Sequence, residues 1–512
     1  MRKMQEEPGS WSTEGCRMVT KLYQHVLAMV FAVNEVNKNT KNLPNVTLGF
    51  HIYDSYYDAK MTTRATLDLL FKLHKFVPNY KCDTKKNLIA IIGGLGSDIS
   101  FCMADILSLY KIPQFTCGSF PQEESNTAQV SSFYHTVPNE IHQDLGIIQL
   151  LKHFGWTWVG LLAEDNDSGE CFLKTLEPLL SQNGICSAFT VRIPQQSSRN
   201  NIDELNSMAR NIYQTFLGTK SRVFVVYGET MTILCLTGLM FLATPELKQN
   251  TSFGKVWIMT AQTDFPVMTF FRNLQMFHGT ISFAIHSDDC PGFQIYLQNT
   301  KPYWTQGDGF FKDFWEQAFS CSFPNPSVPN EDKICIGEKN LGTLPASVFD
   351  MHMLGHSYNI YNVVYAVAHA LQTIDTSKSS HRAMKSKNAE LQDLRPWQLH
   401  PFLQGVSFNN SVGERVSFDE NREMGTGFDI MNVLIYPNSS SLKVKVGRVD
   451  SKEGKHFIIS EDIIVWQRGF NEVLPLSQCT DSCKPGYQKK MKEGEKFCCY
   501  DCAACPEGKI SN

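Results

Sequence analysis

The 512 residues of the chain exceed the length of one ordinary hydrophobic core, so two or three domains are expected. With 42% hydrophobic and 19% charged residues, the composition is that of a globular protein and excludes extensive disorder. The formal net charge of −4 and the lack of a long Lys/Arg run argue against a nucleic-acid partner.

The two ends of the sequence are atypical of a complete secreted protein. Residues 1–15, MRKMQEEPGSWSTEG, contain no apolar run of the length that a signal peptide needs, and we leave them unassigned. The most apolar segment, residues 233–243, is shorter than the ~18 residues that span a membrane. Because the many cysteines still suggest an oxidising compartment, we expect a chain that is incomplete at both ends.

From Cys16 to Trp466, apolar runs of strand length alternate with amphipathic stretches of helical length. The predicted strands are residues 88–92, 158–162, 223–227 and 256–259. The predicted helices are residues 18–37, 141–154, 170–182 and 349–371, and residues 376–392 are expected to form an exposed loop. Such alternation builds parallel sheets, and about 450 residues of it exceed one doubly wound domain, so two α/β lobes are predicted. Ligands of these folds bind beyond the carboxyl ends of the strands.

The turn after the first predicted strand is the most informative local motif. In IIGGLGSDIS, Gly93 to Gly96 allow a sharp turn, and Ser97 opens a helix that is expected to end near Tyr110. A helix N-terminus with a hydroxyl side chain can bind a carboxylate or phosphate, but Ser97 can equally cap its own helix. A dinucleotide fingerprint is the weakest interpretation, because Ile99 stands where its third glycine should be.

No known catalytic motif is found in the sequence. H-E-x-x-H, G-x-S-x-G and P-loop patterns are missing, and isolated histidines such as His51 and His286 are expected in the core or at the surface. The acidic residues 164–167 follow a predicted strand and fit a cation, a ligand amine or an ordinary polar turn. Asp288 and Asp289 indicate a solvated loop. We therefore expect no enzyme activity, no cofactor and no metal site.

Six of the sixteen cysteines crowd into residues 479–505. Their irregular spacing, C-x3-C-x14-C-C-x2-C-x2-C, favours disulfides over a zinc ribbon, although spacing alone leaves both open. Glycosylation sequons agree weakly with an extracellular location. They occur at Asn45, Asn166, Asn250, Asn409 and Asn438.

Six long motifs follow one another along the chain in an informative order. They are LYQHVLAMVFAVNEVN, LPNVTLGFHIYDSYYD, GGLGSDISFCMADILSLYKIPQ, FYHTVPNEIHQDLGIIQLLKHFGWTWVG, GFDIMNVLIYP and CTDSCKPGYQKKMKEGEKFCCYDCAACPEGKIS. This order resembles the extracellular part of class C G-protein-coupled receptors, above all the vomeronasal type-2 (pheromone) receptor branch. The resemblance covers essentially residues 16–512. It implies an α/β, bilobed Venus-flytrap domain of the periplasmic-binding-protein type I fold with two doubly wound lobes, then a cysteine-rich domain and, normally, seven transmembrane helices.

The resemblance also implies the limits of the domains. Lobe 1 would comprise about residues 16–137 and 286–419, and lobe 2 about residues 138–285 and 420–466. A linker, residues 467–478, would lead to a cysteine-rich domain at residues 479–512 that is cut off partway. The full receptor would lie in the cell membrane with this region outside.

A disulfide pattern can be carried over from the resemblance to the calcium-sensing receptor. The implied pairs are Cys16–Cys82, Cys186–Cys498, Cys321–Cys335, Cys479–Cys499 and Cys483–Cys502. The Cys186–Cys498 pair would tie the second lobe to the cysteine-rich domain, and Cys505 would lack a partner. Small buried apolar residues are expected at Cys102, Cys117, Cys171, Cys235 and Cys290.

The ligand site implied by the resemblance is only partly preserved. Ser97, beside Gly96, falls where amino-acid receptors hold the α-carboxylate, and Glu140 falls where an acid faces the α-amine. Three further positions depart from the pattern: Phe120, after Ser119, replaces a small hydroxyl residue, Ser168 replaces an aromatic residue, and Ala261 replaces an acid. Such contacts contribute about 1–3 kcal/mol each, so we expect a peptide or small-protein ligand rather than a free amino acid.

The resemblance implies the ectodomain of a pheromone-sensing receptor, in which ligand-driven lobe closure acts on a seven-helix domain and a G protein. A homo- or heterodimer through residues 100–109 is implied, and ordinary core packing of that stretch is the alternative. A soluble, non-signalling product with the same fold is the main rival function. A solute-binding protein is disfavoured by the cysteine-rich tail, and a nucleotide-dependent enzyme by the missing motifs.

Overall fold

The computed structural model describes residues 19–39, 43, 46–56, 58–71, 88–94, 96–118, 132–194, 202–243, 254–263, 274–301, 309–323, 334–335, 339–346, 348–382, 394–436, 441–450, 457–470 and 474–506. The chain divides into two compact units. Unit 1 comprises Met1–Asn139 and Ile285–Thr426, and unit 2 comprises Glu140–Ala284 and Gly427–Asn512. The lobe limits expected from the sequence lie at 137/138, 285/286 and 419/420, so the third unit limit comes later than expected.

Unit 1 contains helices of very different length around a small parallel sheet. Its helices are α1 (Tyr23–Lys38), α2 (Ala59–Leu70), α3 (Ser97–Tyr110), α8 (Phe293–Asn299), α9 (Gly309–Phe319), α10 (Gly355–Arg382) and α11 (His400–Gln404). Strands β1 (Ile91–Ile92), β2 (Gln114–Thr116) and β3 (Phe133–His135) pair in parallel, and β9 (Ser407–Asn409) forms a hairpin with β10 (Arg415–Ser417).

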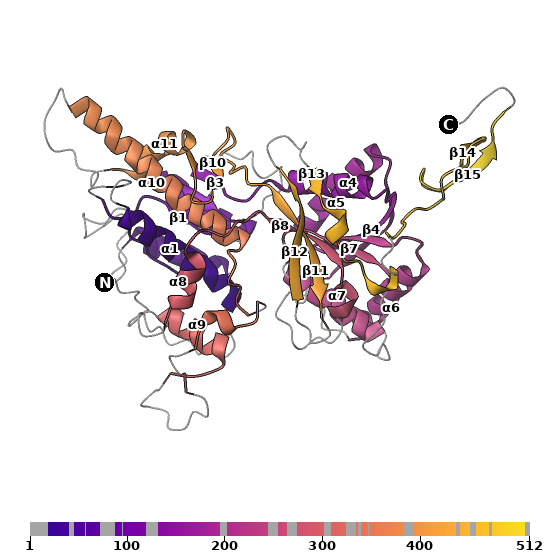
Figure 1. Cartoon of the computed structure of the whole chain (residues 1–512), viewed down its shortest axis with the longest axis horizontal. Helices are drawn as coiled ribbons and strands as arrows, with labels where there is room; N and C mark the ends of the chain where they lie inside the picture. The colour runs from indigo at the N-terminus through magenta and orange to yellow at the C-terminus, as the bar shows by residue number, and fades with distance from the viewer. Residues whose placement is uncertain are drawn as a thin grey trace. The chain divides into compact units, whose positions relative to one another are not determined.

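The core of unit 1 lies between α1 and α10, which run side by side (Figure 1). Phe31 of α1 stacks on Tyr361 of α10 with ring centroids 6.0 Å apart. Glu35 accepts hydrogen bonds from the hydroxyls of Tyr361 and Tyr365, at 2.9 and 3.1 Å. Two helices far apart in sequence thus share one apolar core. The hydrogen bonds of Glu35 with the two tyrosines fix the position of α1 along α10.

Two sequence predictions in unit 1 are only partly correct at α10, which confirms the predicted helix over residues 355–371. Residues 349–354 are not helical, because the buried side chain of Gln24 donates to the carbonyls of Asp350 and His352 and accepts from the backbone N–H of Leu354. At the other end, residues 376–382 continue the helix instead of forming a loop. The hydroxyl of Thr376 returns to a carbonyl one turn earlier, so its polar side chain is compatible with a helix. Residues 383–392 of the predicted loop lie outside the described part of the chain.

The other predictions in unit 1 concern element ends. The strand predicted at residues 88–92 is regular only at Ile91–Ile92. The helix predicted at residues 18–37 begins as a 3₁₀ turn, η1 (Thr20–Leu22), and becomes α-helical at Tyr23. The helix after the glycine turn is confirmed as α3.

Unit 2 is built on one eight-stranded sheet with the order β13-β12-β11-β8-β7-β6-β4-β5. Its strands are β4 (Trp158–Glu164), β5 (Cys186–Ile193), β6 (Val223–Tyr227), β7 (Val256–Met259), β8 (Thr280–Ile285), β11 (Phe428–Ile435), β12 (Ser441–Val449) and β13 (Phe457–Ile459). Strands β5, β4, β6, β7 and β8 are parallel, and β11, β12 and β13 pair antiparallel. Every residue of β6 and β7 is buried, as expected for the centre of a parallel sheet covered on both faces.

Helices cover both faces of this sheet. They are α4 (Glu140–His153), α5 (Asp167–Gln182), α6 (Ile202–Gly218) and α7 (Thr230–Ala243). Figure 1 shows α4 and α5 on one face and α6 and α7 on the other. Phe216 of α6 and Ile233 of α7 pack with Phe224 and Trp257 of the central strands in one buried cluster. The doubly wound layering predicted from the sequence is therefore present in unit 2.

The cysteine-rich segment belongs to unit 2 and is joined to its sheet by covalent and polar contacts. It forms a hairpin of β14 (Tyr487–Met491) and β15 (Tyr500–Ala504). The structure contains the disulfides Cys186–Cys498, Cys321–Cys335, Cys479–Cys499 and Cys483–Cys502, four of the five pairs that the resemblance implied. Cys16 and Cys82 of the fifth pair lie outside the described residues.

Short 3₁₀ turns complete the described elements. Besides η1 they are η4 (Leu274–Phe277), η6 (Leu341–Thr343), η8 (Pro396–Leu399), η9 (Glu461–Ile463) and η10 (Arg468–Phe470). Among the helices of the described residues, none is both long enough and apolar enough to cross a membrane. Of the remaining cysteines, Cys117 and Cys290 are buried as expected, whereas Cys102, Cys171 and Cys235 are only partly buried.

Candidate ligand-binding site

A polar cluster lies at the carboxyl edge of the sheet in unit 2. Tyr227 is the last residue of β6, Glu164 is the last residue of β4, and residues 260–262 follow β7. Because these three parallel strands are neighbours, their carboxyl ends meet at one edge, where α/β proteins bind ligands. Glu140, the first residue of α4, reaches the same edge.

Glu140 is the centre of the cluster. Both of its carboxylate oxygens accept from the hydroxyl of Tyr227 at 3.3 Å, and one accepts from Nε2 of Gln262 at 2.7 Å. The ring of Tyr227 is stacked on Phe172 of α5 with centroids 4.4 Å apart, which fixes the direction of its hydroxyl. Burial, with the nearby charge of Glu140, raises the pKa of Tyr227 well above its usual value, so the phenol keeps its proton and donates.

A second carboxyl group, Asp144, lies one helical turn after Glu140. Its side chain is 2% exposed, and its Oδ1 has no hydrogen-bond partner in the described part of the chain. Burial raises the pKa of Asp144 well above the usual value, and the charge of Glu140 adds to the effect. Two acids in one turn, one of them buried, form a site that favours a hydrogen-bond donor or a positive group.

Neighbouring amides leave further polar atoms unpaired among the described residues. Gln143 is fully buried and accepts from the backbone N–H of Ala261 at 2.7 Å, but its Nε2 has no partner there. The same holds for the hydroxyl of Thr260 and for Oε1 of Gln262. An unpaired buried polar atom costs about 1–3 kcal/mol, so these atoms and the two acids of α4 make this edge of the sheet the candidate ligand site of unit 2.

The acidic turn of residues 164–167 is an ordered cap as well as part of this edge. The side chain of Asn166 accepts from the backbone N–H of Gly169 and caps α5, whose first turn contains the half-buried Ser168. Glu164 accepts from the hydroxyl of Thr232 at 2.9 Å. Asp165 pairs with Arg192 at 3.9 Å. The contacts within this motif are therefore those of a polar turn.

The glycine turn of unit 1 is a compact backbone structure at the start of α3. Gly94 has a φ of +86°, and a β-carbon at this position would meet the side chain of Ser100. The hydroxyl of Ser100 is within 2.9 Å of the hydroxyl of Thr116 and donates to the carbonyl of Gly96. Gly96 is the N-cap residue and Ser97 the first residue of α3, so the structure does not place Ser97 at the cap position.

The predicted site residues fall in three groups. Glu140, Ser168 and Ala261 all belong to unit 2, where Glu140 and the segment around Ala261 are in contact through Gln143 and Gln262. Gly96 and Ser97 belong to unit 1, at the N-terminus of α3. Ser119 and Phe120 lie outside the described residues. Of the predicted sequons, Asn409 is exposed, whereas Asn45, Asn250 and Asn438 also lie outside them.

Sequence reasoning missed Asp144, Tyr227 and Gln262. Asp144 was detectable, because it follows Glu140 by four residues in a predicted helix and must share its face. Tyr227 ends a predicted strand and was therefore a candidate for the carboxyl edge. Gln262 carries no such signal, because residues 260–262 have no regular structure that could be read from a pattern.

The linker brings the cysteine-rich segment against the opposite edge of the sheet of unit 2. The indole N–H of Trp156 donates to the carbonyl of Pro475 at 2.6 Å. The backbone N–H groups of Thr157 and Trp158 donate to the carbonyl of Ser477, at 2.9 and 3.0 Å. Lys496 donates to Ser187 beside the Cys186–Cys498 disulfide. The linker and the cysteine-rich segment that follows it are thus held at the amino ends of β4 and β5.

Comparison with known proteins gives the family. Residues 24–434 match the model of the receptor family ligand binding region, and residues 474–512 match the model of the nine cysteines domain of family 3 (class C) G-protein-coupled receptors. The chain belongs to the class C G-protein-coupled receptor family. This confirms the predicted class and the periplasmic-binding-protein-like fold, in agreement with the parallel central sheet of unit 2.

Several class C receptors are similar to this chain. Mouse vomeronasal type-2 receptor 26 is 32% identical over 499 residues, which cover 96% of the chain and 56% of the receptor. The human extracellular calcium-sensing receptor is 29% identical over 537 residues, with 98% and 48% covered, and mouse vomeronasal type-2 receptor 116 is 28% identical over 499 residues, with 96% and 56% covered. The chain thus spans about half the length of the curated relatives it matches, and these relatives are receptors rather than enzymes.

Proposed function

We propose that this class C chain is the ligand-binding ectodomain of a pheromone-sensing receptor and that its ligand is a peptide or small protein. The observation that carries the proposal is the cluster around Glu140 at the carboxyl edge of unit 2. It combines one hydrogen-bonded acid, the buried acid Asp144 and polar atoms of Gln143 and Thr260 that lack partners among the described residues. A ligand that supplies donors and a positive group stabilises such a surface.

Two substitutions support a peptide rather than a free amino acid. Ala261 stands where the resemblance implies an acid, and its contribution to the cluster is a backbone N–H held by Gln143. Ser168 stands where an aromatic residue is implied and offers no ring for stacking. An amino acid would lose about 1–3 kcal/mol for each such contact, whereas a peptide can make further contacts outside the cluster.

In this proposal, ligand binding favours closure of the two lobes. The bias can be no larger than the difference in ligand affinity between the open and closed forms. The anchoring of the cysteine-rich segment supports transmission, because the Cys186–Cys498 disulfide makes that segment follow any displacement of unit 2.

The same proposal gives the chain its place in a complete receptor. The ectodomain would lie outside the cell, bind without catalysing a reaction, and act on a G protein through seven transmembrane helices. It would form a homo- or heterodimer through residues 100–109. In that stretch Leu109 is 78% exposed, whereas Met103 and Leu107 are buried with Ile91 and Ile112 in a smaller apolar cluster of unit 1. Only the exposed face is available for such a contact.

A thermal-shift series with the 512-residue chain tests the ligand class. The probes are the common L-amino acids one at a time and a pool of random-sequence peptides. We expect the peptide pool to raise the melting temperature of the parent chain, and Glu140→Gln to abolish the effect, because the variant removes the charge that pairs with the ligand. A ligand at about 100 times its Kd adds about 2.7 kcal/mol.

Two variants make the series decisive. Glu177→Gln is the matched control, because Glu177 is an exposed acid on α5 of the same unit. This variant should bind the peptide pool like the parent chain. Strong stabilisation by one common amino acid at micromolar concentration, abolished by Ser97→Ala, would contradict the peptide proposal.

A further inference from the structure

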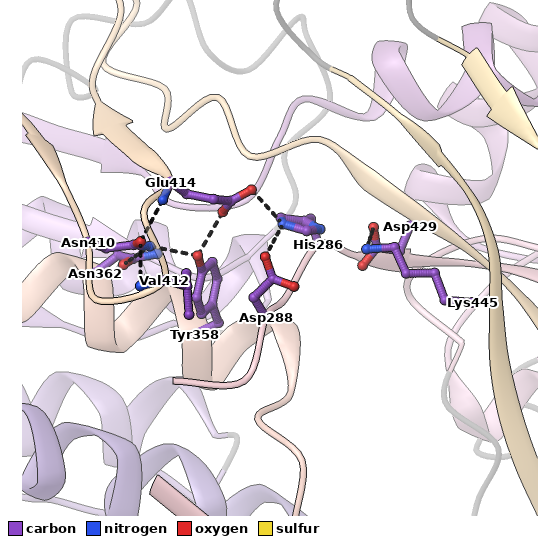
Figure 2. Close-up of polar contacts among 9 residues, drawn as sticks. All are labelled: His286, Asp288, Tyr358, Asn362, Asn410, Val412, Glu414, Asp429 and Lys445. Carbon is purple, nitrogen blue, oxygen red and sulfur yellow. Dashed lines mark hydrogen bonds and ion pairs between the residues drawn. The ribbon is translucent and has the colours of Figure 1, made fainter. Parts of the chain in front are cut away.

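A second group of convergent polar side chains lies in unit 1, outside the candidate ligand site. His286, Asp288 and Glu414 point toward one another in Figure 2. The Nε2 atom of His286 is 2.9 Å from Oε1 of Glu414 and 3.6 Å from Oδ2 of Asp288. These three donor atoms all lie within 4.8 Å of one another. An imidazole nitrogen and two carboxylate oxygens therefore face one small volume.

The three residues come from two segments that are distant in the sequence. His286 and Asp288 lie in the loop between β8 and α8, and Glu414 ends the turn that joins β9 to β10. The side chain of His286 is fully buried, whereas those of Asp288 and Glu414 are 45% and 26% exposed. The imidazole thus forms the closed side of the cluster, and the carboxylates leave an open side through which an ion can enter.

Outer contacts hold the Glu414 carboxylate in this direction. Its second oxygen accepts from the hydroxyl of Tyr358 at 2.7 Å, and that hydroxyl accepts from Nδ2 of Asn410 at 2.6 Å. Oδ1 of Asn410 accepts from the backbone N–H of Glu414 at 2.9 Å, so the turn is closed around the same residues (Figure 2). Hydrogen bonds of this kind orient the ligands of metal sites and leave one oxygen for the ion.

We propose that His286, Asp288 and Glu414 bind one Zn²⁺ ion. Zinc takes imidazole nitrogen and carboxylate oxygen at about 2.0–2.2 Å, and donor atoms this close together can reach a common ion with small side-chain shifts. Three protein ligands leave a fourth position for water or for a group of a bound molecule. Calcium prefers six to eight oxygen ligands and magnesium an octahedral set with several waters, so one nitrogen and two carboxylates suit them poorly.

Zinc would replace the hydrogen bond between His286 and Glu414 by two metal–ligand bonds. Neutral imidazole binds the ion through the lone pair of Nε2, so its one ring proton has to lie on Nδ1 in the zinc-bound form. The ion then joins the loop after β8 to the β9–β10 turn, which are both parts of unit 1. The alternative is a purely structural hydrogen bond between the two residues, with no affinity for a metal.

Isothermal titration of the 512-residue chain with Zn²⁺ separates these alternatives after the protein has been dialysed against a chelator and then against buffer. We expect the parent chain to bind one equivalent of Zn²⁺ at this site. Asp288→Asn and Glu414→Gln should each weaken that binding at least about tenfold, because each removes a ligand. Asp288 is half exposed, and glutamine at position 414 can still accept from Tyr358, so both variants should fold.

Asp289→Asn is the matched control for position. Asp289 is the next residue along the loop and is similarly exposed, but its carboxylate pairs with His352 at 2.7 Å. The control variant should therefore bind Zn²⁺ like the parent, and added Ca²⁺ should not compete. Loss of binding in Asp289→Asn with binding retained in Asp288→Asn would move the site to His352 and overturn the proposal.

Co²⁺ gives a second readout that distinguishes this site from the free cysteines. The proposal predicts visible d–d bands without the near-ultraviolet charge-transfer band of a thiolate ligand, and predicts their loss in Glu414→Gln. No saturable Zn²⁺ binding, equal affinity in the parent and in both ligand variants, or a thiolate band that carries all of the binding would each refute the site.

Discussion

Ser477 is one of the buried contacts through which the linker of the cysteine-rich segment reaches the sheet of unit 2. Its side chain is fully buried, its hydroxyl donates to the carbonyl of Trp158, and its oxygen accepts from the backbone N–H of Arg222 at 3.0 Å. We predict that Ser477→Ala loosens this junction without changing the backbone contacts of residue 477. The variant removes the hydroxyl alone and leaves the carbonyl that Thr157 and Trp158 share.

The magnitude follows from which partners stay paired. The carbonyl of Trp158 keeps a second donor, the hydroxyl of Ser221 at 2.9 Å, so its loss is small. The N–H of Arg222 has no such replacement among the contacts described and loses its acceptor. An unpaired buried donor costs about 1–3 kcal/mol, so we expect a loss of about 2 kcal/mol of local stability. A change of this size lowers protection of the affected amides about 30-fold.

Hydrogen exchange followed by mass spectrometry is the assay, on the peptide that contains the amide of Arg222. Ser181→Ala is the control, because its hydroxyl also bonds a backbone carbonyl but on the exposed surface of α5. The control should change stability by no more than about 0.5 kcal/mol. Equal protection of the Arg222 peptide in Ser477→Ala and in the control would refute the reasoning.

Three further changes test other parts of the account. Gly94→Ala should destabilise unit 1 by about 1–3 kcal/mol in denaturant unfolding, because φ is +86° and the methyl group meets Ser100. Asp144 has a raised pKa in the folded state, so its contribution to stability is present below the unfolded pKa and is lost as pH rises through the folded pKa. In Asp144→Asn, this loss of stability with rising pH should disappear. Cys186→Ser with Cys498→Ser should lower stability by about 2–5 kcal/mol and increase proteolysis of the linker.

Two of these changes have a control in the same chain. Gly184 also has a positive φ but open space around it, so Gly184→Ala measures backbone strain without the clash, and an equal loss would contradict the packing argument. For the pH series the control is Asp203→Asn on the exposed surface of α6. An unchanged pH profile in Asp144→Asn would show that Asp144 does not cause the loss of stability with rising pH. For the disulfide, proteolysis of the linker at the parent rate would contradict the anchoring.

Several regular elements of the fold could be predicted from sequence periodicity, and the failures have identifiable causes. Fully buried strands such as β6 and β7 are continuous apolar runs that local pattern suffices to find. The non-helical stretch before α10 could not be predicted, because it depends on the side chain of Gln24, more than 300 residues away. Its apolar pattern is compatible with a helix, and a tertiary contact decides against it.

The sequence predicted an acid in the candidate site, but it did not show which other residues belong to the site. Glu140 was found through the family resemblance, and the cluster shows why an acid there has partners. The spacing of Asp144 to Glu140 placed both acids on one helix face, but a carboxylate on an amphipathic helix is usually at the surface, and only the fold shows that Asp144 is buried. The cluster of His286, Asp288 and Glu414 in unit 1 was missed for a different reason. His286 and Glu414 are 128 residues apart and belong to no sequence motif.

Signalling by a chimaera tests the central claim most directly. The 512-residue chain would be fused to the remaining cysteine-rich and transmembrane part of a vomeronasal type-2 receptor and expressed at the cell surface. The account predicts that the peptide fraction that stabilises the isolated chain activates a G protein, and that the double variant Cys186→Ser with Cys498→Ser binds the fraction but signals less. Binding at the surface without any signal, or equal signalling by the double variant, would contradict transmission through the anchored cysteine-rich segment.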